Sequence, residues 1–68
     1  MTETLGEALP REMARVRDEV LPVYLTIPTG IFAATMMRND LDAAAKAMAE
    51  GDTVEMLRVY KSLKEYRL

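Results

Sequence analysis

Cysteine and histidine are both absent from the 68-residue sequence. Without cysteine no disulfide can form, and without either residue ordinary zinc ligation is excluded. The commonest general base and the thiol nucleophile of enzymes are missing as well, so most catalytic arrangements cannot be assembled. We therefore predict that the protein is not an enzyme, and we identify no catalytic residue, cofactor-binding residue or small-molecule substrate.

Motifs for phosphates and hard cations are also lacking. Neither G-x-G-x-x-G nor G-x-x-x-x-G-K occurs, so Thr29-Gly30 is interpreted as a helix cap rather than an anion site. Asp40 and Asp42 would point about 200° apart on a helix and could not share one ion. Asp42 with Lys46, four residues later, predicts an ordinary surface pair. We expect no cofactor and no metal ion.

The short length limits the hydrophobic core. A chain of this size forms one domain and its core contributes only a few kcal/mol of net stability. Small domains are often supported by disulfides, a metal or self-association, and only self-association remains open to this composition. A homo-oligomer is therefore expected.

Positive charge is scarce except at the C-terminal end. The formal net charge is −2, which argues against a dedicated nucleic-acid-binding protein. Residues 1–55 carry five Lys or Arg against ten Asp or Glu, whereas residues 56–68 carry four against one. Positive side chains near the C-terminal end of the last helix interact favourably with the helix dipole, which is the preferred interpretation. Weak nucleic-acid binding through these four cations stays an alternative. The basic-face candidates are Arg58, Lys61, Lys64 and Arg67.

No signal peptide is evident, because residues 1–7 lack a basic segment and an apolar segment, and we expect a cytoplasmic protein. One uncharged run, residues 20–37, reaches the lower length limit of a membrane span. Pro28-Thr29-Gly30 at its centre would break a single spanning helix, so membrane association is not expected. A small holin-like protein that inserts residues 20–37 as a kinked span or hairpin is the alternative.

Apolar residues recur every three or four positions, which predicts helices over residues 10–25, 31–50 and 53–66. Residues 1–8 show no such period and are expected to form a frayed leader, with Pro10 at the first helical position. Pro22 predicts a kink, while Gly51 and Asp52 predict a helix end followed by an N-cap. The fold class is all-α, with residues 9–68 as one domain. Either a three-helix antiparallel bundle or a helical hairpin completed by oligomerisation satisfies this pattern.

Apolar residues are in surplus around the Pro28 loop. A core this thin cannot accommodate all of them, and an exposed apolar cluster marks an interface. The interface candidates are Leu25, Ile31, Phe32, Met36 and Met37. The sequence therefore predicts a non-enzymatic interaction or accessory protein, with a protein partner or a second copy of itself.

Several short segments share their pattern with one group of proteins. They are Leu9-Pro10-Arg11-Glu12, Arg15-Val16, residues 27–32, Met36-Met37, Gly51-Asp52 and Met56-Leu57-x-x-Tyr60. In these segments the chain resembles small helical proteins of proteobacteria and their prophages, over about residues 9–64. Those proteins have no assigned function, so the resemblance implies a phage or prophage context and no mechanism. Among phage proteins of this kind, a host-directed inhibitor and a small virion or packaging component are both expected roles.

Overall fold

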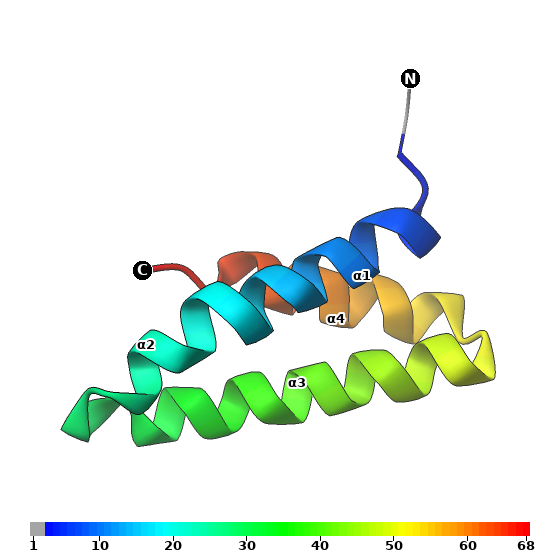
Figure 1. The fold of residues 1–68 in the computed structure, drawn as a ribbon. Helices are drawn as coiled ribbons and strands as arrows, with labels where there is room; N and C mark the ends of the chain where they lie inside the picture. The colour runs from blue at the N-terminus through cyan, green and yellow to red at the C-terminus, as the bar shows by residue number, and fades with distance from the viewer. Residues whose placement is uncertain (1–2) are drawn as a thin grey trace.

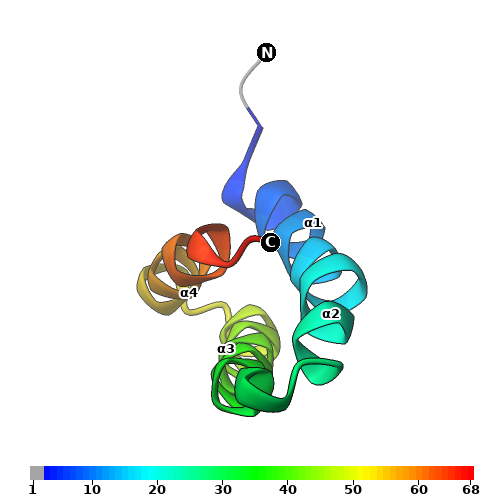
Figure 2. The same cartoon turned by 90° about the vertical axis from the view of Figure 1, so that its left-hand side faces the viewer.

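A computed structural model describes residues 3–68 of the protein. Its helices are α1 (Leu5–Arg15), η1 (Val16–Val20), α2 (Leu21–Leu25), η2 (Pro28–Gly30), α3 (Ile31–Glu50) and α4 (Thr53–Glu65), and the described residues form no strand. The prediction of an all-α fold is confirmed. Helices α1 and α2 continue one another along a single rod, α3 runs back beneath it, and α4 reverses direction again (Figure 1). Viewed end on, the three rods lie at the corners of a triangle (Figure 2).

Helix α1 begins at Leu5, earlier than the sequence predicts. Glu7 explains this start, because its Oε1 accepts hydrogen bonds from the Thr4 hydroxyl at 2.8 Å and from the Thr4 backbone N–H at 3.5 Å. Ala8 is already buried. The predicted frayed leader is therefore wrong for residues 5–8, while residues 1–2 lie outside the described part. Pro10 lies inside α1 rather than at its first position.

Pro22 is accommodated by one π-helical turn. In this turn, η1, the Leu21 N–H donates to the Val16 carbonyl, five residues earlier. The α-helix then resumes with Pro22 in its first turn, a position that proline tolerates. The rod thus reaches Leu25, and the expected kink takes the form of a π turn.

The turn between α2 and α3 depends on Gly30 in a way the sequence does not reveal. The φ of Gly30, −89°, is open to any residue, so the turn does not need a glycine for its backbone conformation. What Gly30 provides is space, because a Cβ there would lie 2.4 Å from the Tyr24 carbonyl oxygen. A close approach of two backbone segments therefore fixes how α3 leaves the turn.

The turn between α3 and α4 matches the sequence prediction. Gly51 adopts a left-handed conformation with φ of 67°, and the Asp52 N–H donates to the Ala47 carbonyl at 2.9 Å. The Asp52 carboxylate then accepts a hydrogen bond from the Glu55 N–H at 3.1 Å and caps α4. Two residues are thus enough to reverse the chain.

The core lies between the three rods. Its fully buried side chains come from all of them. Three of the buried residues of α3 are alanines, Ala34, Ala44 and Ala47, which let α3 approach its neighbours closely. The core cluster consists of Leu9, Val16, Val20, Leu21, Ala34, Met37, Ala44, Val59 and Leu63. So few large side chains give a small domain only limited stability.

Candidate interaction surfaces

The most exposed apolar side chains of α3 lie at its N-terminal end. Phe32 is 75% exposed, Ile31 is 62% exposed and Met36 is 46% exposed. Leu25 and Ile27, just before the Pro28 turn, are exposed as well. We call Leu25, Ile27, Ile31, Phe32 and Met36 the apolar end. Four of its members are predicted interface residues, and the structure leaves all four uncovered.

Met37 does not belong to this surface. The sequence predicts an interface role for it beside Met36, but its side chain is only 1% exposed and packs in the core. On a helix, neighbouring residues point about 100° apart, so α3 turns Met37 inward while Met36 faces solvent. The assignment of Met37 to the interface is therefore wrong.

Pro28 and its neighbours also interrupt the uncharged run of residues 20–37. The run is divided between η1, α2, the η2 turn and the first part of α3. Within residues 3–68, no helix combines the length and the apolar character needed to cross a membrane.

The four basic candidates on and after α4 are exposed, but two of them make contacts with neighbouring side chains of α4. The Arg58 guanidinium forms an ion pair with Glu55, one turn earlier. The Lys64 ammonium lies 5.3 Å from the centroid of the Tyr60 ring, within range of a cation–π contact. Lys61 and Arg67 complete the set, and the Arg67 carbonyl accepts a hydrogen bond from the Tyr24 hydroxyl at 3.1 Å. Local contacts therefore engage two of the four cations.

Arg15 ties the first rod to the end of α4. Its Nη2 donates to the Leu63 carbonyl at 2.9 Å, and its Nε donates to Glu12 at 2.6 Å. Arg15 is accordingly half-buried and turns toward α4. A positive charge beside the last carbonyl groups of a helix also interacts favourably with the helix dipole.

The predicted surface pair of Asp42 and Lys46 is not formed: no ion pair joins them among the described residues.

A further polar contact at the end of α4 joins Tyr66 to Asp40 of α3. The Tyr66 hydroxyl donates to the Asp40 carboxylate at 2.7 Å, so Asp40 has a structural partner. Partial burial first, and this hydrogen bond second, raise the pKa of Tyr66 from 10.0 to about 12. The contact therefore has a pH dependence that can be measured.

We expect the protein to lose stability between pH 10 and pH 12 through Tyr66. The phenol ionises at about pH 10 in the unfolded chain and only near pH 12 in the folded one. Its stabilisation is therefore complete below pH 10 and disappears as the pH rises to about 12. Urea unfolding at several pH values measures this loss, and absorbance of the phenolate measures the ionisation. Tyr66→Phe should remove the phenolate that appears near pH 12 and flatten the pH dependence in this interval. An unchanged late phenolate in Tyr66→Phe would show that the assignment is wrong.

A shallow groove runs between the C-terminal half of α3 and the start of α4. It has a volume of about 290 Å³ and mixes small apolar side chains with charged ones. Its lining residues are Ala43, Lys46, Ala47, Glu50, Asp52, Glu55 and Arg58. The sequence analysis missed this groove, because it depends on how α3 and α4 pack and no local pattern encodes it.

Chemistry-bearing clusters are not found in the part of the chain that the structure describes. No three His, Cys, Asp or Glu side chains are placed to hold a metal ion there, and no buried side-chain polar atom in it lacks a hydrogen-bond partner.

The chain matches no protein-family model, and no curated protein or solved structure is similar to it. The resemblance to small proteobacterial and prophage proteins stays a prediction. The apolar end and the α3–α4 groove are the candidate sites.

Proposed function

We propose that the protein is a non-enzymatic interaction protein that binds another protein surface through the apolar end. The observation that carries the proposal is the exposure of Phe32, the only phenylalanine of the chain, together with that of Ile31 one residue earlier. Burying a side chain such as Phe32 in an interface contributes about 2 kcal/mol. Large aromatic side chains of this kind are common anchors of binding energy.

The surroundings of Phe32 support the same function. No Asp, Glu, Lys or Arg occurs between Val20 and Met37, so no ionic side chain from this stretch would have to be desolvated on binding. Depletion of charge at the centre with polar residues around it is typical of protein interfaces. Thr26, Thr29 and Thr35 are exposed beside the apolar end and provide such polar groups.

Two specific roles, suggested by the resemblance to prophage proteins, are compatible with this function. A host-directed inhibitor and a virion or packaging component would both use a docking surface of this kind, in the cytoplasm or in an assembled particle. The identity of the partner distinguishes the two roles.

Site-specific photo-crosslinking in expressing cells tests the proposal. A photoreactive phenylalanine analogue replaces Phe32, and in a matched control it replaces Val54, which is 82% exposed at the start of α4. The two positions lie toward opposite ends of the molecule (Figure 1). We expect a discrete protein adduct from position 32 and none from position 54. No adduct from position 32, or the same adducts from both positions, would contradict the proposal.

A further inference from the structure

Three side-chain hydrogen bonds in the described part of the chain join segments that are far apart in the sequence. They span 48, 43 and 26 positions, and all of them end within residues 63–67. Their other ends are Arg15 on α1, Tyr24 on α2 and Asp40 on α3. After α4 the chain crosses from that helix toward the first rod (Figure 2). Residues 63–67 therefore connect all three rods through polar contacts.

Residues 22–29 are attached to the bundle through one side chain. They include most of α2 and the chain that leads to α3, and Tyr24 is the only one of them that is not exposed. The Tyr24 ring packs against the core, and its hydroxyl donates to the Arg67 carbonyl at 3.1 Å. The Tyr24 backbone carbonyl lies so close to Gly30 that a Cβ there would be 2.4 Å from its oxygen. Tyr24 therefore fixes both residues 22–29 and the start of α3.

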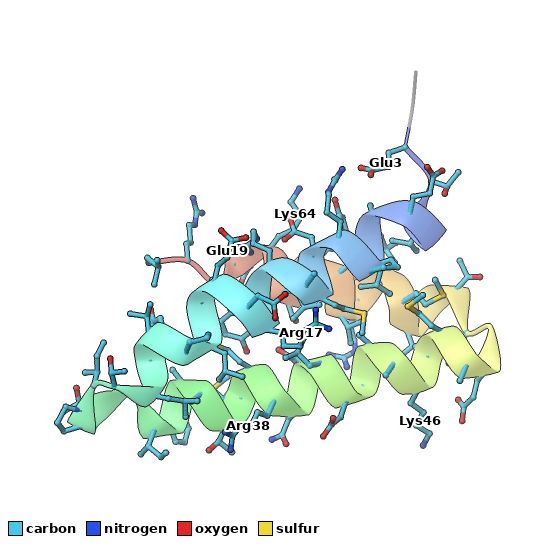
Figure 3. All side chains as sticks on the ribbon, viewed as in Figure 1. Glu3, Arg17, Glu19, Arg38, Lys46 and Lys64 are labelled. Atoms are coloured by element: carbon cyan, nitrogen blue, oxygen red, sulfur yellow. The ribbon has the colours of Figure 1, made fainter. Side chains whose placement is uncertain are left out.

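Arg67 is placed in turn by Tyr66. The backbone of Tyr66 is extended, with φ of −77° and ψ of 121°, and leads the chain out of α4. Its ring packs against the core, and its hydroxyl donates to the Asp40 carboxylate at 2.7 Å. Asp40 is half-buried, whereas Arg38 on the same helix points away from the other helices (Figure 3). The two contacts therefore act in series, because the Asp40 contact places the carbonyl that Tyr24 binds.

We propose that residues 66–67 form a latch that keeps residues 22–29 in place, and that release of this latch opens residues 22–29 while the rest of the bundle stays folded. The opening segment carries Leu25 and Ile27, which belong to the apolar end. The latch thus determines whether these two side chains lie beside Phe32. This consequence for binding rests on the proposed function, whereas the opening itself does not.

The rest of the bundle has its own support. None of the buried apolar side chains belongs to residues 22–29 or to the latch. Arg15 joins α1 directly to the Leu63 carbonyl, inside α4 and before the latch begins. Segments with few buried apolar side chains open at a lower cost in free energy than the core does. The core can therefore stay packed when residues 22–29 detach.

Amide hydrogen exchange followed by NMR tests the latch. The Gly30 N–H donates a hydrogen bond of 2.9 Å within the turn before α3, so its exchange reports the opening of residues 22–29. Tyr24→Phe and Tyr66→Phe each remove one hydroxyl and keep the ring that packs against the core. We expect Gly30 to exchange at least about five-fold faster in both variants, the factor that corresponds to one ordinary hydrogen bond. Unchanged exchange of Gly30 in either variant would overturn the latch.

Tyr60→Phe is the matched control. Tyr60 is the third tyrosine of the chain and also packs against the core, but it takes part in neither hydrogen bond of the latch. Its loss of a hydroxyl should leave the exchange of Gly30 unchanged. If Tyr60→Phe accelerates Gly30 as much as the two latch variants do, the effect is not specific to residues 66–67 and the proposal is wrong.

Low concentrations of urea separate the opening of residues 22–29 from unfolding of the whole bundle. The N–H of Val59, a fully buried residue of α4, reports unfolding of the core. In the wild-type chain Gly30 should be less protected than Val59 and should respond only weakly to urea, because a small opening exposes little surface. Equal protection and equal urea dependence at the two amides would show that residues 22–29 open only together with the core, which contradicts the proposal.

The double variant Tyr24→Phe/Tyr66→Phe tests whether the two contacts act in series. Loss of the Tyr66 hydroxyl should already displace the carbonyl that Tyr24 binds, so the double variant should exchange Gly30 no faster than Tyr66→Phe alone. Independent contacts would instead multiply the two single effects. A multiplied effect would overturn the serial arrangement of the latch.

The latch and the proposed function fail in different ways. Faster exchange of Gly30 in both latch variants, combined with no photo-adduct from position 32, would support the latch and overturn the proposed function. A discrete adduct from position 32, combined with unchanged exchange of Gly30, would support the function and overturn the latch.

Discussion

Replacing Met37 by alanine is expected to lower the free energy of unfolding by about 2–5 kcal/mol, the usual cost of truncating a buried methionine. Met37 is 1% exposed and contributes one of the few large side chains of the core. The total stability of a 68-residue domain is roughly 3–10 kcal/mol, so this single change should remove a large part of it. Urea unfolding followed by circular dichroism measures the difference.

Met36→Ala is the matched control. It removes the same atoms one residue earlier from a side chain that is 46% exposed, and we expect a loss below about 1 kcal/mol at concentrations where the chain is monomeric. Equal losses from the two substitutions would contradict the orientation of α3. A larger loss from Met36→Ala would mean that the face of α3 with Met36, and not the face with Met37, packs in the core.

Replacing Gly30 by alanine should destabilise the protein by about 1–3 kcal/mol, because overpacked side chains cost this much when the surroundings must shift. The added Cβ would lie 2.4 Å from the Tyr24 carbonyl oxygen, which is backbone and cannot rotate away. The turn between α2 and α3 would have to open, and the position of the apolar end would change with it. The midpoint of urea unfolding reports the loss.

Gly6→Ala provides the comparison for Gly30→Ala. Gly6 lies in the first turn of α1, where an added Cβ would be 3.9 Å from the nearest side-chain atom. Alanine has a higher helix propensity, so this substitution should leave the protein unchanged or stabilise it by up to about 1 kcal/mol. If Gly30→Ala were as well tolerated as Gly6→Ala, the close approach at Tyr24 would be disproved.

The parts of the fold that follow from local chemistry were predictable. Helix α3 occupies the predicted residues 31–50, because alanine-rich helical periodicity and the Gly51-Asp52 pair mark its body and its end. The same holds for the start of α4, where the Asp52 cap is encoded within four residues. Signals of this kind act over one or two turns and do not depend on the rest of the molecule.

Some features of the fold were missed. One of them, the early start of α1, is local and could have been found, because Thr4 and Glu7 have the spacing of a capping box. In contrast, no local pattern shows that Arg15 reaches the Leu63 carbonyl, 48 residues away, or that α3 and α4 enclose a groove. The two adjacent methionines at 36 and 37 were assigned to one surface because composition alone does not tell which of them faces inward.

The candidate site was predicted in outline from a simple excess of apolar residues. Leu25, Ile31, Phe32 and Met36 were identified because a thin core cannot contain every apolar residue around the Pro28 loop, and the structure leaves them exposed. The α3–α4 groove, in contrast, appears only in the folded chain.

The most direct test of the central claim is fluorine NMR of the chain with fluorinated phenylalanine. Phe32 is the only phenylalanine, so a single resonance reports on the proposed anchor. The resonance should show the full shift between H₂O and D₂O expected of an exposed ring, because Phe32 is 75% exposed. A resonance without a solvent shift at low concentration would place the ring inside its own bundle.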